Sequence, residues 1–75
     1  MTHELKIEKA FLEAKKEGDK LFEIRFNGDR GFQKGDLVKY FDHESNDFIH
    51  FLITYVSNYE QRANWVVFGE KPLED

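Results

Sequence analysis

The fold is decided by the stretch Gly18-Asp19-Lys20-Leu21-Phe22-Glu23-Ile24-Arg25. Before it, residues 8–17 contain no β-branched residue and combine apolar and charged side chains, which predicts a helix. Gly18 then stands where a glycine commonly ends a helix. After it, every second residue is apolar, which predicts a strand over residues 20–26. The stretch therefore marks a change from helix to strand.

The two periodicities also predict which faces of these elements are buried. A strand turns successive side chains to opposite faces. We therefore expect the core side of strand 20–26 to carry Phe22, Ile24 and Phe26. The opposite side is expected to carry Leu21, Glu23 and Arg25. In the helix, the apolar stripe at helical spacing is predicted to be Ile7, Phe11 and Ala14, with Ala10 beside them.

The rest of the chain is predicted to be β-strand, turn and loop. Alternating or continuous apolar runs separated by turn residues indicate strands at residues 3–7, 37–42, 48–56 and 64–69. The order is strand, helix and then four strands, joined by short turns that favour antiparallel neighbours. We therefore predict a single α+β, mainly β domain over residues 1–75, with residues 71–75 as a frayed tail.

Composition restricts the class of protein further. With 75 residues, no cysteine and three histidines without zinc-site spacing, the chain predicts one small domain with no disulfide, metal or cofactor. The first residues lack the basic and apolar regions of a signal peptide, and no apolar run is long enough to span a bilayer. We expect a soluble, cytoplasmic monomer with no membrane partner.

The charge balance limits which partners are expected. The formal net charge is −4, which argues against strong binding to nucleic acid regardless of its sequence. Much of the acid lies near the two ends of the chain, so a local basic pocket is still compatible with the total.

The chemically suggestive side chains lie around the predicted strand 20–26. Glu23 and Arg25 are two residues apart, so they point to the same side of it. Lys20 stands at its beginning, and Arg30 follows the next turn. Two or three cations with one carboxylate suit a phosphate or a base, since guanidinium binds phosphate and carboxylate accepts amino groups. From charge pattern alone, the alternative is a solvated strand face on which Glu23 and Arg25 pair with each other.

An ordered set of motifs resembles a known family. Gly18-x-Lys20-x-x-Glu23-x-Arg25 is similar to the GxKxxExR signature of the ASCH domain, a member of the PUA-like group. With residues 3–7 (HELKI) before it, residues 32–37 after it and the closing run Trp65–Phe68, nearly the whole chain resembles the ASCH-related family known as DUF3850.

The resemblance implies a PUA-like pseudobarrel of about five to six mostly antiparallel strands, with one helix after the first strand. It also implies binding of RNA, or of a modified nucleotide, in a cleft between helix and barrel. Carried over by position, that cleft is lined by Gly18, Lys20, Glu23, Arg25 and Arg30. Where the family often has Lys, this chain has Phe26, and Gly28 is an insertion in the loop before Arg30.

Two other functions stay open. One branch of the ASCH group resembles amidohydrolases that act on acylated cytidine, which would make Lys20 and Glu23 the catalytic residues. Glu23 then stands where that branch has a threonine, so we lean against an enzyme. The other alternative is a protein-interaction domain, which the acidic net charge favours.

Overall fold

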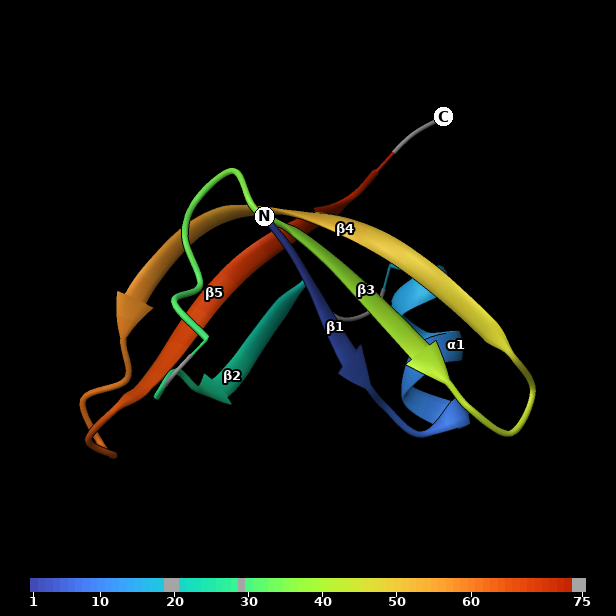
Figure 1. Ribbon diagram of the computed structural model, residues 1–75, viewed down its shortest axis with the longest axis horizontal. Helices are drawn as coiled ribbons and strands as arrows, with labels where there is room; N and C mark the ends of the chain where they lie inside the picture. The colour runs from blue at the N-terminus through green and yellow to red at the C-terminus, as the bar shows by residue number, and fades with distance from the viewer. Residues whose placement is uncertain (19–20, 29, 74–75) are drawn as a thin grey trace.

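A computed structural model describes residues 1–18, 21–28 and 30–73 of the chain (Figure 1). Its elements follow the predicted order of one strand, one helix and four strands. They are β1 (Thr2–Lys6), α1 (Lys9–Lys16), β2 (Phe22–Phe26), β3 (Leu37–Asp42), β4 (Asp47–Asn58) and β5 (Trp65–Pro72).

The five strands form one curled sheet, a half-barrel, in the order β1-β3-β4-β5-β2. β1 pairs with β3 in parallel, and the other three pairings are antiparallel. Figure 1 shows β4 arching over the sheet and α1 lying beneath β3 and β4, on the concave side. The prediction of a mainly β, mostly antiparallel domain with one helix is confirmed.

β4 is the strand that produces the curl. Its first half pairs with β3 and its second half pairs with β5, and the register shifts between Ile53 and Tyr55. Such a bulge bends a strand and increases its twist. Beyond it, the Tyr55 ring lies against Gly69, where an added Cβ would come within 2.0 Å of the ring. Glycine at this position therefore lets the ring lie close to β5.

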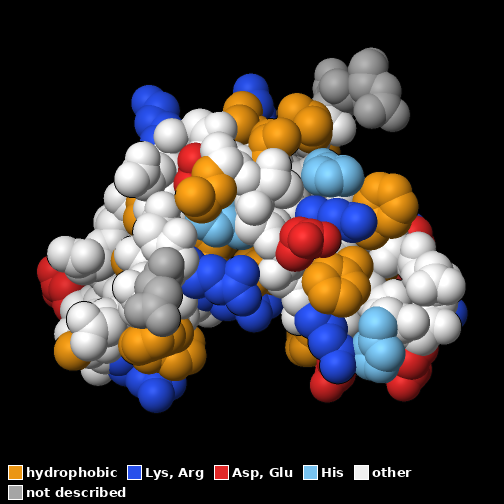
Figure 2. All heavy atoms as spheres, in the orientation of Figure 1, with side chains coloured by type: hydrophobic (Ala, Val, Ile, Leu, Met, Phe, Trp, Pro, Cys, Tyr) orange, Lys and Arg blue, Asp and Glu red, His pale blue; other side chains and the backbone are white. Residues whose placement is uncertain are grey.

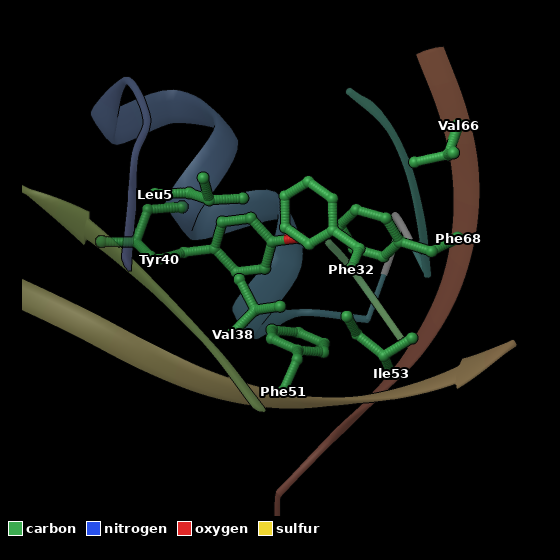
Figure 3. Packing of buried hydrophobic residues seen from close by; sticks show 9 residues of the cluster. Leu5, Phe32, Val38, Tyr40, Phe51, Ile53, Val66 and Phe68 are labelled. Carbon is green, nitrogen blue, oxygen red and sulfur yellow. The ribbon is translucent and has the colours of Figure 1, made fainter. Parts of the chain in front are cut away.

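The core lies inside the curl and joins every strand except β2 to the helix (Figure 3). Its fully buried members include Leu12 from α1, Tyr40 from β3 and Phe51 from β4. Phe32 comes from the loop before β3 and packs on Phe68, with 4.9 Å between ring centroids. This loop thereby closes one end of the core.

The predicted core side of β2 was wrong. Phe22, Ile24 and Phe26 are 48%, 36% and 53% exposed, whereas Glu23 is only 5% exposed. β2 is an edge strand whose inner face meets Lys15 of α1, and that buried ammonium lies 3.2 Å from a Glu23 oxygen. A buried cation needs a carboxylate partner, so the charged side of β2 faces inward.

The predicted apolar stripe of the helix was also wrong. Phe11 is 51% exposed, and the buried positions are Leu12 and Lys15. These two residues are three apart and therefore lie on one helix face. The predicted end of the helix was right: Gly18 has φ +81° and donates its N–H to the Lys15 carbonyl. Only glycine adopts that conformation without strain.

The last strand is longer than the sequence indicated. β5 continues to Pro72, where we expected the frayed tail to have begun, and Leu73 donates its N–H to the carbonyl of His50. Glu70 lies inside this strand and is buried. The extension matters because it brings an acidic residue into the interior.

Asp36 anchors the first strand to the loop before β3. Its carboxylate accepts a hydrogen bond from His3 at 2.8 Å and one from the Gln33 N–H, and it lies 3.5 Å from the N-terminal ammonium. The hydrogen bond from His3 is the main reason that the pKa of Asp36 lies below its usual range. The ionised form is therefore favoured by folding.

Replacing Asp36 with asparagine is expected to lower stability near neutral pH. A carboxyl group whose pKa is lowered in the folded state adds stability above its unfolded pKa, and this is lost as the pH falls through the folded pKa. The difference between Asp36→Asn and the unchanged protein should therefore shrink between about pH 7 and about pH 2.5. Urea unfolding at both values measures it, with the exposed Glu60→Gln as control. A difference independent of pH would contradict this role.

Candidate functional site

A lysine is buried at the centre of a charged network between the helix and the sheet. The Lys15 side chain is 0% exposed, and its Nζ lies 2.6 Å from Glu70 Oε2 and 3.2 Å from Glu23 Oε1. The other Glu70 oxygen accepts a hydrogen bond from the Tyr40 hydroxyl at 2.5 Å. The Lys15 ammonium also lies 4.2 Å from the centroid of the Tyr40 ring, a cation–π contact. The network thus joins α1, β2, β3 and β5.

The network is electrically balanced by its own members. Burial raises the pKa of Glu70, while the hydrogen bonds from Lys15 and Tyr40 act in the opposite direction. Burial and the neighbouring Glu70 raise the pKa of the Tyr40 hydroxyl well above its usual range, so it stays protonated and donates. Within the described residues, every buried side-chain nitrogen and oxygen has a hydrogen-bond partner. Such full pairing is what makes buried charge tolerable.

Arg25 is the member of this network that reaches solvent. It donates from Nε to Glu23 Oε2 at 2.8 Å, and its side chain is 30% exposed. Its two terminal amino groups make no hydrogen bond to any residue in the described ranges. Glu23 therefore bridges Lys15 inside to Arg25 outside and fixes the orientation of the guanidinium.

Arg25 lies between two hollows on the open side of the half-barrel. One, of about 370 Å³, is lined by Leu5, Arg25, Phe26, Arg30, Phe32 and Trp65. The other, of about 740 Å³, lies between Arg25, residues 6–11 from the end of β1 into α1, and residues 42–44 from the end of β3 into the next turn. We call them the aromatic pocket and the helix pocket. Figure 2 shows the notch between the two lobes of the molecule, with Lys and Arg side chains gathered at its roof.

The structure brings together some of the predicted site residues. Glu23 and Arg25 are in direct contact, and Arg25 and Arg30 line the same pocket. Arg30 also donates to the carbonyl of Glu4 at 3.3 Å, which holds it beside β1. Gly18 ends the helix and lines neither pocket. Lys20 lies outside the described residues.

Sequence reasoning missed the three residues that complete the network. Lys15, Tyr40 and Glu70 were assigned no role, yet all three are buried. A signal for Glu70 was present, because it continues the alternation of Val66 and Phe68 along β5. Lys15 gave no such signal, since lysine on a short helix is normally solvated.

The chain is similar to one known family. Residues 2–69 match the family model described as a domain of unknown function, DUF3850. The chain belongs to the DUF3850 family. The match covers Lys15, Glu23, Arg25 and Tyr40 and ends one residue before Glu70. A comparison of this DUF3850 domain with curated proteins finds no match.

Two features are absent from the part of the chain that the structure describes. None of the helices in that part of the DUF3850 domain is long and apolar enough to cross a membrane. The same part contains no group of three or more His, Cys, Asp or Glu side chains placed to hold a metal ion.

Proposed function

We propose that this DUF3850 domain binds single-stranded RNA, or a modified nucleotide, at Arg25, and that its half-barrel is related to the ASCH domains of the PUA-like group. The observation that carries the proposal is that the hydrogen bond to Glu23 fixes the orientation of the Arg25 guanidinium. Glu23 fixes Nε while the terminal amino groups of Arg25 are left for a ligand. Such preorganised donors bind phosphate and base acceptors strongly.

The aromatic pocket suits a nucleobase. Phe26 and Trp65 form part of its wall, in an edge-on contact with 6.2 Å between ring centroids. Stacking on exposed aromatic rings is the usual way in which single-stranded nucleic acid is bound. Arg25 and Arg30 lie in the same wall, so a base and an anionic group can be contacted together.

The helix pocket offers cations that the adjoining phosphate could contact. It is lined by the cationic residues Lys6, Lys9 and Arg25. Arg25 lines both pockets. A strand with its base in the aromatic pocket would therefore place the adjoining phosphate in the helix pocket. Glu8, Asp42, His43 and Glu44 line it too, and the three carboxylates limit how much negative charge the pocket accepts. Because the chain has a net charge of −4, we propose selective binding at this one site and not general binding to nucleic acid.

Arg25→Ala is expected to weaken binding of a fluorescently labelled single-stranded RNA by roughly ten- to hundredfold, because it removes charge-assisted hydrogen bonds. Fluorescence anisotropy at two salt concentrations measures it, and the variant should also show a smaller salt dependence. Lys34→Ala removes an exposed charge that lines neither pocket and is the control. Equal affinity of the unchanged protein and a folded Arg25→Ala would refute the proposal.

One observation favours a second candidate, a protein-interaction domain. The outer side of β2 exposes Phe22, Ile24 and Phe26 in a row on an edge strand. Exposed apolar rows of this kind mark contact surfaces. The amidohydrolase has less support, because both oxygens of Glu23 are held by Lys15 and Arg25. Incubation with N4-acetylcytidine would test it, and release of cytidine would restore it.

A further inference from the structure

The side chains around the aromatic pocket share one chemical property. Those that form hydrogen bonds are Arg25, Arg30 and Trp65. Arginine and the indole of tryptophan are donors only. The remaining lining side chains, Leu5, Phe26 and Phe32, are apolar. The side chains lining the pocket therefore offer hydrogen-bond donors and no acceptor.

Glu23 determines which donors of Arg25 remain. Because Nε is bonded to Glu23, the guanidinium presents its two terminal amino groups side by side. That edge matches two adjacent acceptors in one plane. Lys15 holds the other oxygen of Glu23 from within the core, so the edge is fixed by buried residues and does not depend on the ligand.

We propose that the aromatic pocket selects a guanine base, whose O6 and N7 form an edge of two adjacent acceptors. This inference rests on the proposed function and adds the base to it. Adenine and cytosine present amino groups, which are donors, and these would meet the donors of Arg25 and Arg30 without a partner. An unpaired polar group in such a pocket costs affinity.

A pocket that offers only hydrogen-bond donors could also bind phosphate. The RNAs compared must therefore carry the same number of phosphates. Single-stranded pentamers of sequence CCXCC differ only in the central base and carry the same phosphates. With X as guanine or hypoxanthine, O6 and N7 are present. With X as 7-deazaguanine, N7 is missing, and with X as adenine, O6 is replaced by an amino group.

The dissociation constants are measured by NMR titration of the isotope-labelled domain, following the Trp65 indole N–H, which belongs to the only tryptophan of the chain. The guanine and hypoxanthine pentamers should bind equally, and at least about tenfold more tightly than the adenine pentamer. The 7-deazaguanine pentamer should be intermediate. Arg25→Lys keeps the charge and loses the paired donors, so it should bind all four pentamers alike.

The outcomes separate the two proposals. Equal binding of the four pentamers by the unchanged protein, or tighter binding of adenine, overturns guanine selection and leaves RNA binding intact. Guanine selection is also overturned if Arg25→Lys still binds the guanine pentamer more tightly than the adenine pentamer, or if the Trp65 signal does not shift on binding. Absence of binding to every pentamer and to the longer labelled RNA removes the proposed function itself.

Discussion

Replacing Lys15 by methionine is expected to lower the free energy of unfolding by about 3–5 kcal/mol. The methionine fills a similar volume, so the loss comes from charge. Without the ammonium, Glu70, whose side chain is 0% exposed, and Glu23, at 7%, face each other across the interior. Urea unfolding followed by circular dichroism measures the change. Lys16→Met is the matched control, because Lys16 pairs with Asp47 at the surface and should cost about 0–1 kcal/mol.

The dependence on pH separates this loss from a packing defect. Burial already raises the pKa of Glu70, and removing Lys15 removes the hydrogen bond that opposes the rise. The folded variant then holds a proton that the unfolded chain releases above about pH 4.3. Stability of Lys15→Met should therefore increase as the pH is lowered from about 8 to about 5.5. A deficit that stays constant over this range would show that charge is not its cause.

Removing Lys15 and Glu70 together is expected to cost less than the sum of the two single changes, by at least about 2 kcal/mol. In Lys15→Met/Glu70→Leu, no uncompensated pair remains, because Glu23 keeps its hydrogen bond from Arg25. Glu70→Leu alone leaves the ammonium with one carboxylate, and it leaves the Tyr40 hydroxyl without its acceptor. Some cost therefore remains in the double variant.

The measurement is a double-mutant cycle of unfolding free energies in urea, with Tyr40→Phe in the Glu70→Leu background to remove the unpaired hydroxyl. That further change should recover part of the cost, since an unsatisfied buried hydroxyl costs about 1–3 kcal/mol. Additive effects of Lys15→Met and Glu70→Leu would contradict a direct interaction between the two side chains.

Much of the fold was predictable because its signals are local. The bounds of β3 are those predicted. Gly18 ends the helix as expected. Both features depend on only a few neighbouring residues, so the sequence around them is enough to predict them. The order of elements along the chain follows from the same local patterns, whereas the order in the sheet does not, because the consecutive strands β2 and β3 are not neighbours there. The end of β5 was missed because Lys71 and Pro72 are held by pairing with β4, a contact distant in sequence.

The buried faces of α1 and β2 could not be predicted from periodicity. A hydrophobic pattern assigns Phe11, Phe22 and Ile24 to the core, whereas all three are exposed. The face of β2 is decided by an ion pair between Glu23 and Lys15, two residues on different elements. Burying either charged side chain without the other would be unfavourable, so a rule based on neighbouring residues cannot identify the pair.

The candidate site was predictable in part for the same reason. That Glu23 and Arg25 share a side follows from the geometry of any strand, and they are in contact. That this side faces the core, with Lys15 and Glu70 behind it, depends on the curl of the sheet. The resemblance to DUF3850 pointed to residues 18–25, and the packing shows that Glu23 is buried while Arg25 is partly exposed.

We propose above that Arg25, held by Glu23, is the ligand-binding group of the domain. The most direct measurement is an NMR titration of the isotope-labelled protein with a short single-stranded RNA. We expect the largest shifts on the Arg25 Nε–H and the Trp65 indole N–H, which lie at the aromatic pocket. Shifts confined to Phe22 and Ile24 on the outer side of β2, or no shifts at all, would contradict it.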